Sequence, residues 1–134
     1  NSVSAHRGLG LAYSEAGQHR EAIAELKQAL SLSENSPVVL GYLGMVYARG
    51  NSRADADGVL RDLDAMSSRA YVPSSAVALV YVGLGDTSRA LDALQKAYDE
   101  HDFGITQIAT APWFKALSSD PRFGALVSKL GLRQ

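Results

Sequence analysis

The chain has 134 residues, 46% of them hydrophobic, and its 13 basic and 14 acidic residues leave a net charge of −1. It has no basic stripe to neutralise nucleic-acid phosphates, no cysteine for a disulfide framework or thiolate metal site, and no run near the roughly 20 apolar residues of a membrane span. Its size and apolar content suit one domain with a continuous core, and we expect no contact with nucleic acid or a membrane.

The first two elements are expected to be a pair of helices. Apolar and small residues recur at helical spacing over residues 4–16, and Gly17 ends that helix because glycine tolerates the left-handed conformation. A second amphipathic pattern covers residues 19–33. Ser36 then serves as the N-cap and Pro37 as the first-turn residue of the next helix.

Two further helix pairs follow. The second pair is expected at residues 37–49 and 53–68, and its first helix is apolar almost all round, so it should be the central, most buried helix. The third pair is expected at residues 73–83 and 87–100, with Asp86 as the N-cap of its second helix.

The remaining residues, 103–134, are expected to form a C-terminal cap. Pro112 interrupts any further helix pair. The cap begins with a short run that holds Phe103, Ile105 and Ile108. A short apolar piece follows at residues 113–117. Asp120 and Pro121 then signal the start of a last helix, whose apolar stripe should pack on the third pair.

A period of 34 residues runs through the three helix pairs and is set by Tyr13, Tyr47 and Tyr81. The same interval separates Leu9, Leu43 and Val77; Gly10, Gly44 and Ala78; Ala22, Ala56 and Ala90; and Leu26, Leu60 and Leu94. Small residues in this register allow two helices to approach closely, and the large ones fill the space beside them. The period therefore predicts three equivalent helical hairpins.

Leu-Gly-x-x-Tyr followed by Ala-x-x-x-Leu at this fixed period resembles the tetratricopeptide repeat. The resemblance implies an all-α fold, a right-handed α-solenoid of three helix-turn-helix hairpins plus C-terminal capping helices. We expect a single domain over residues 1–134, with repeats at about 3–36, 37–70 and 71–102 and the cap at 103–134.

The resemblance also implies a role, which is binding another protein or peptide through the concave face of the first helix in each repeat. By analogy with the family, the groove-lining residues are Arg7, Leu11, Glu15, Val38, Met45, Arg49, Leu79 and Val82. The middle of this face is apolar and suits a hydrophobic helix or an extended peptide. The lysine and asparagine set with which some members clamp a terminal carboxylate is missing, which disfavours recognition of chaperone tails.

The apolar face has three candidate occupants. The C-terminal segment itself could cover it, because Trp113 and Phe114 are large enough to do so. An external peptide could bind there, or a second copy of the chain could pack on it as a homodimer. We expect a protein or peptide partner, with homo-oligomerisation through the same face as the alternative.

A second resemblance covers residues 68–132, about half of the chain. These residues are similar to the C-terminal end of repeat arrays in bacterial multidomain regulators, where such arrays follow a winged-helix DNA-binding domain, a serine/threonine kinase, a nucleotide cyclase or a TolB-like domain. The stretches that carry the likeness are RAYVP at 69–73, ALVYVGLGD at 78–86, KAYDE at 96–100 and LSSDPRF at 117–123. The resemblance implies the terminal part of a longer bacterial regulatory protein. We expect a cytoplasmic location.

No catalytic or metal-binding set is present in the sequence. His6, His19 and His101 fall in three segments, without the spacing that would place two metal ligands on one helix face. The Gly-x-Gly pairs at 8–10 and 83–85 imitate half of a dinucleotide fingerprint but follow no predicted strand. We therefore expect no enzyme activity, no metal and no cofactor.

Overall fold

The chain folds as a stack of helical hairpins. The computed structural model describes residues 2–107 and 110–131, and within those ranges it contains helices and no strand. The repeat helices are α1 (Val3–Glu15), α2 (His19–Leu32), α3 (Pro37–Arg49), α4 (Arg53–Ser67), α5 (Ser74–Leu84) and α6 (Thr87–Asp99). Two short 3₁₀ helices, η1 (Phe103–Gln107) and η2 (Pro112–Leu117), precede α7 (Pro121–Lys129). The predicted all-α fold is confirmed, and each predicted end of the repeat helices lies within one residue of the observed end.

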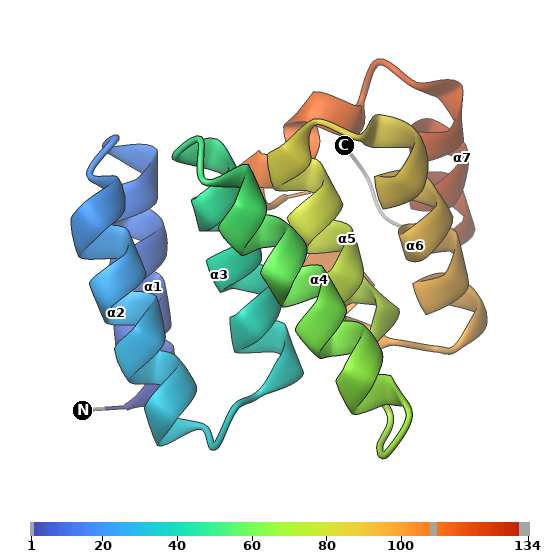
Figure 1. Ribbon diagram of the computed structural model, residues 1–134. Coiled ribbons are helices and arrows are strands. Elements are labelled where there is room, and N and C mark those ends of the chain that lie inside the picture. Colours follow the sequence, from blue (N-terminus) through green and yellow to red (C-terminus); the bar gives the residue numbers. More distant parts are fainter. Residues whose placement is uncertain (1, 108–109, 132–134) are drawn as a thin grey trace.

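The helices form two layers. Figure 1 shows α2, α4 and α6 in front and α1, α3 and α5 behind them, in chain order across the molecule. Packing is most extensive between α3 and α5 and between α1 and α2, whereas α1 touches α3 only slightly. The rear layer is therefore closed on one side of α3 and more open on the other.

The turn of each hairpin repeats the same backbone geometry. The φ angle is positive at the fourth residue after each repeat tyrosine: 78° at Gly17, 65° at Asn51 and 74° at Gly85. The next amide donates to the tyrosine carbonyl oxygen, at 2.8 Å for Gln18 to Tyr13, 2.8 Å for Ser52 to Tyr47 and 3.0 Å for Asp86 to Tyr81. Glycine and asparagine adopt this left-handed conformation at low cost. The sequence period is thus also a backbone period.

Small residues of the repeat lie where helices approach closely. A Cβ atom added to Gly10 would be 2.9 Å from Leu26 Cγ, and one added to Gly44 would be 2.7 Å from Val80 Cγ2. The repeated alanines Ala22, Ala56 and Ala90 are all fully buried. Every residue from 39 to 46 in α3 is buried, which confirms that α3 is the central helix.

Polar contacts hold the start of the third hairpin. Ser74 Oγ donates to Glu100 Oε1 at 2.9 Å, and Asp102 Oδ2 accepts from the Ser75 amide at 2.9 Å. Asp102 therefore caps α5 from outside the helix, since Pro73 at the N-cap supplies no side-chain hydrogen bond. These contacts bring the chain leaving α6 back against α5.

The C-terminal segment packs on the third hairpin. Both η1 and η2 contact α5 and α6, and α7 lies against α6. Asp120 caps α7 by accepting from the Arg122 amide at 2.9 Å. The buried apolar residues of this segment are Ile105, Phe114, Leu117, Phe123, Leu126 and Val127. The prediction that the last helix packs on the third pair is confirmed, while Ile108 lies outside the described residues.

Candidate functional site

The residues predicted to line a groove differ widely in exposure. Met45 is fully buried, and Leu79 is only 4% exposed. Glu15 is exposed, and the half-buried members of the set are Arg7, Leu11, Val38, Arg49 and Val82. The two buried side chains offer no surface to a partner in this conformation, so the face divides into a closed part on α3 and α5 and an open part between α1 and α3.

The closed part results from direct contact between the backbones of α3 and α5. A Cβ atom added to Gly41 would lie 2.6 Å from the Ala76 carbonyl oxygen. A Cβ atom added to Gly83 would lie 2.6 Å from the Met45 carbonyl oxygen. Both distances are shorter than van der Waals contact, so the two glycines are what allow these helices to touch. No space remains between them for a ligand side chain.

The open part is bridged by two polar contacts between α1 and α3. Arg7 places its guanidinium carbon 5.8 Å from the centre of the Tyr42 ring, and Arg49 Nη2 lies 3.2 Å from Glu15 Oε2. Arg7, Leu11 and Glu15 follow one another at intervals of four residues and therefore share one face of α1. Leu11 thus lies between the two bridges.

Tyr42 belongs to this face although sequence reasoning did not select it. Its ring meets Trp113 of η2 edge to face, with 5.5 Å between ring centres and 87° between ring planes. Burial raises the pKa of the Tyr42 phenol, and the positive charge of Arg7 partly offsets that rise. The residues 34 positions before and after Tyr42 are Gly8 and Ala76, which are small. The large aromatic side chain at this position departs from the repeat, and this departure is the signal in the sequence that could have identified Tyr42.

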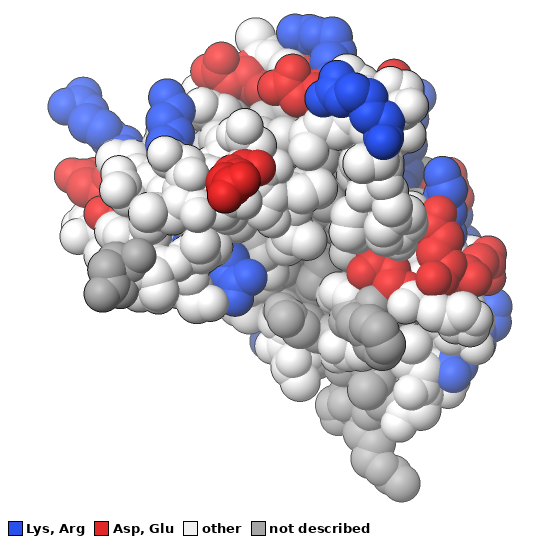
Figure 2. Space-filling view, turned by 90° about the horizontal axis from the view of Figure 1, so that it is seen from below, with Lys and Arg blue, Asp and Glu red and all other residues white. Residues whose placement is uncertain are grey.

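Charge is unevenly distributed over the surface. In Figure 2 the charged side chains gather along the upper edge and the right side of the view. A hollow lies in the middle of the same view, with a basic side chain near its left edge and an acidic side chain near its right edge.

The structure also places the three histidines singled out in the sequence. His6 Nδ1 lies 2.8 Å from Glu25 Oε1, and the His19 ring packs near Gly50. His101 follows α6 with a φ of 60°. In the part of the chain that the structure describes, no three His, Cys, Asp or Glu side chains are grouped to hold a metal ion. The helices of that part are too short or too polar to cross a membrane.

Comparison with known proteins identifies one repeat. The family model described as the tetratricopeptide repeat matches residues 3–36, which comprise α1, α2 and the connection to α3. No curated protein and no solved structure matched the chain. Repeats of this family generally mediate contacts between proteins and are typically not catalytic.

Proposed function

We propose that this chain, which carries a tetratricopeptide repeat at residues 3–36, is a non-enzymatic module that binds a peptide or helix of another protein between α1 and α3. The observation that carries the proposal is the position of Leu11. Its apolar side chain is half-buried between the Arg7–Tyr42 contact and the Glu15–Arg49 ion pair, and part of its surface stays accessible. A partner can bury an apolar side chain on Leu11 while polar groups at both ends orient it.

The proposed site is narrower than the set named from the sequence. Arg7, Leu11, Glu15, Val38 and Arg49 lie on α1 and α3, and all five have accessible surface. Val82 is half-buried and lies on α5, outside the pair of helices that form the proposed site. Met45 and Leu79 act in this proposal through the core, because they support α3 and α5 and do not touch the partner.

The alternative is homodimerisation through the same apolar face.

The proposal also extends to the biological setting: the resemblance of residues 68–132 to the ends of repeat arrays supports a place in a cytoplasmic bacterial regulatory protein. There the module would present its α1–α3 face to a protein partner that the regulator senses or recruits.

The test compares two leucine-to-glutamate variants. Leu11→Glu places a charge in the proposed site, whereas Leu32→Glu makes the same change at an exposed leucine on α2. Peptides selected from a displayed random library on the wild-type domain are labelled, and their affinities are measured by fluorescence polarisation. We expect Leu11→Glu to weaken binding at least tenfold with unchanged circular dichroism, and Leu32→Glu to leave it intact.

The same variants decide between the two proposals. Light scattering over a wide concentration range should give a constant monomer mass for the wild type. A mass that doubles with concentration, and that Leu11→Glu restores to the monomer, would replace the peptide proposal with the dimer. Selected peptides that bind both variants equally would contradict the placement of the site.

A further inference from the structure

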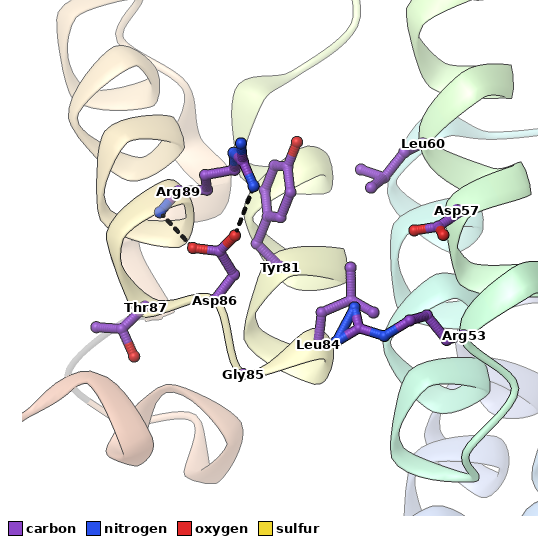
Figure 3. A pocket seen from close by; sticks show the side chains of 9 residues that line it. All are labelled: Arg53, Asp57, Leu60, Tyr81, Leu84, Gly85, Asp86, Thr87 and Arg89. Atoms are coloured by element: carbon purple, nitrogen blue, oxygen red, sulfur yellow. Dashed lines mark hydrogen bonds and ion pairs between the residues drawn. The ribbon is translucent and has the colours of Figure 1, made fainter.

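A cleft separates α4 from the third hairpin. Its first part has a volume of about 510 Å³, and its lining includes Arg53, Asp57, Leu60, Tyr81, Leu84 and Arg89. Figure 3 shows Asp57 and Leu60 on the α4 side, opposite Tyr81 of α5 and the Asp86–Arg89 pair of α6. A second part, of about 320 Å³, shares Leu60 and Tyr81 and adds Leu63, Asp64, Ser67, Val72, Ser74, Val77 and Lys96. We call the two parts together the α4 cleft.

The repeat period reveals which substitutions accompany the open cleft. The residues 34 positions before Asp57 and Asp64 are Ile23 and Leu30 of α2. The residues 34 positions after them are Leu91 and Tyr98 of α6. The four equivalent side chains are apolar and pack against the core. Only α4 has carboxylates at these two positions, and both of them line the cleft.

A third substitution affects the end of the cleft. Between the first two hairpins, the His19 ring packs so closely on Gly50 that a Cβ atom there would be 3.2 Å from His19 Cγ. The positions that correspond to His19 and Gly50 hold Arg53 and Leu84 in the next pair. A leucine side chain occupies the space that glycine leaves empty, which prevents the same close approach.

The consequence is visible in the packing. α4 packs less extensively on α5 than α2 does on α3. Leu60 is half-buried, whereas its equivalents Leu26 and Leu94 are fully buried. The α4 cleft therefore has an accessible apolar floor at Leu60 and Tyr81, with a carboxylate to either side along α4.

The two carboxylates are also unpaired. Among the described residues, neither the Asp57 nor the Asp64 carboxylate has a hydrogen-bond or ion-pair partner, while Arg89 is neutralised by Asp86 at 3.0 Å. Seven residues of α-helix separate the two aspartates, so they lie about 10 Å apart along α4. They present two negative charges on either side of Leu60.

We propose that the α4 cleft binds an extended segment of a partner protein in which two basic side chains flank an apolar one. In an extended chain, residues i, i+2 and i+4 share one face and span about 13 Å. The apolar side chain packs on Leu60 and Tyr81, and the flexible lysine or arginine stems reach Asp57 and Asp64. Arg53 lines the first part of the cleft and Lys96 lines the second part. Both side chains can donate hydrogen bonds to backbone carbonyl groups of the bound segment.

This arrangement gives up packing between hairpins that α2 retains on α3. Departures from an otherwise consistent repeat are expected at functional positions, because stability alone favours the apolar residues. The cleft lies on α4, α5 and α6, whereas the site between α1 and α3 uses other residues, so the two surfaces can act independently.

The experiment uses two matched double variants. Asp57→Asn with Asp64→Asn removes the two charges of the cleft. Asp55→Asn with Asp62→Asn removes two charges of the same helix, with the same spacing, at exposed residues outside the cleft. Twelve-residue peptides are selected from a displayed random library on the wild-type domain, and their affinities for each variant are measured by fluorescence polarisation.

We expect a class of selected peptides that carries the basic-x-apolar-x-basic pattern. Its affinity should fall at least tenfold in the Asp57/Asp64 variant, remain within twofold in the Asp55/Asp62 variant, and be insensitive to Leu11→Glu. Filling the cleft with Asp57→Ile and Asp64→Leu should abolish binding of this class and raise the thermal midpoint. The proposal is overturned if no such class is selected, if both charge variants behave alike, or if the cleft variant changes only the mass of a self-associated domain.

Discussion

At the scale of single residues, glycine determines how closely the rear-layer helices approach. Gly41 and Gly83 lie where any side chain would meet the backbone of the opposite helix. Gly8, in contrast, has nothing within 4 Å of the position of an added Cβ atom. Some helical glycines in this chain are therefore required by close packing and others are not. Helix propensity alone does not distinguish the two kinds.

We expect Gly41→Ala and Gly8→Ala to change stability in opposite directions. The added methyl group at position 41 must push α5 away from α3, and overpacking of this kind costs about 1–3 kcal/mol. At position 8 the same change removes a flexible residue from a helix and should stabilise by about 0.5–1 kcal/mol. Urea unfolding of both variants measures the difference. A stabilising effect at position 41 would show that α3 and α5 are farther apart than described.

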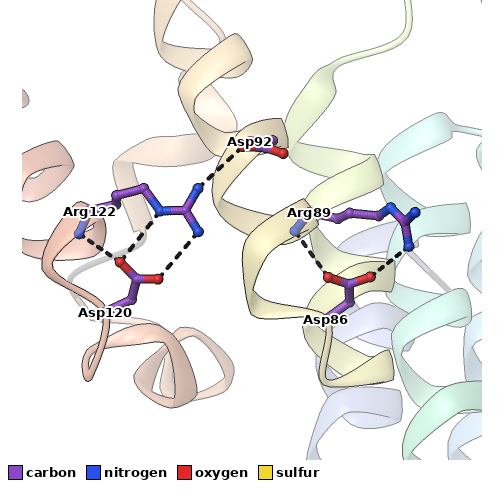
Figure 4. A network of polar contacts seen from close by, with 5 residues as sticks. All are labelled: Asp86, Arg89, Asp92, Asp120 and Arg122. Carbon is purple, nitrogen blue, oxygen red and sulfur yellow. Dashed lines mark hydrogen bonds and ion pairs between the residues drawn. The ribbon is translucent and has the colours of Figure 1, made fainter.

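At the scale of elements, an aspartate is the N-cap of one helix in the third hairpin, α6, and of one helix in the C-terminal cap, α7. Figure 4 shows Asp86 bound to the Arg89 amide and guanidinium, and Asp120 bound in the same way to Arg122. Arg122 also reaches Asp92 at 3.3 Å, which ties α7 to α6. The pKa of each capping carboxyl is lowered, first by the backbone hydrogen bond and then by its arginine.

These lowered pKa values predict a specific acid sensitivity. The folded-state pKa of Asp86 and Asp120 lies below the unfolded value of about 3.9. Their contribution to stability is therefore present above that pH and is lost as the pH falls through the folded-state pKa. Asp86→Asn with Asp120→Asn keeps cap-forming side chains but removes this titration.

The measurement is the thermal midpoint between pH 6 and pH 2.5. We expect the midpoint of the double variant to fall less on acidification than that of the wild type. The Asp62→Asn variant is the control, because Asp62 is exposed in the middle of α4 and lies outside the first turn of any helix. A wild-type acid response in the capping variant would show that the two caps do not contribute.

At the scale of the whole molecule, η2 connects the C-terminal segment to the centre of the stack. Trp113 contacts Tyr42 of α3, while Phe114 and Leu117 are buried in the core cluster shared with the three hairpins. In an array of repeats, contacts of this kind couple the stability of neighbouring units. The segment therefore closes part of the rear layer and joins it to the third hairpin.

This coupling predicts a single unfolding transition. Trp113 is the one tryptophan of the chain, so its fluorescence reports on η2, whereas far-ultraviolet circular dichroism reports on all helices. We expect the two signals to change at the same urea concentration, as two-state unfolding requires. A fluorescence midpoint at lower urea would show that η2 leaves the stack before the repeats unfold.

Local signals in the sequence were sufficient for the hairpins. The turns were marked by Gly17 and Gly85, and the N-caps by Ser36 and Asp120. Both kinds of signal are readable from the sequence because these residues act on backbone groups within a few positions. The candidate site was harder to predict. Met45 occupies a groove position of the repeat, yet its burial depends on how the other helices pack around it. The residues next to Met45 in the sequence do not indicate how those helices pack.

The all-α fold, the 34-residue hairpin and the central place of α3 could be predicted from the residues alone, since periodicity and turn chemistry are local properties repeated three times. Which parts of the surface are open follows from the way the helices pack. The contact of Gly41 and Gly83 with the facing helices closes α3 on α5, and Asp57, Asp64 and Leu84 accompany an open cleft between α4 and the third hairpin. The physical reason is that exposure depends on contacts between residues distant in the chain, which a repeat pattern leaves undetermined.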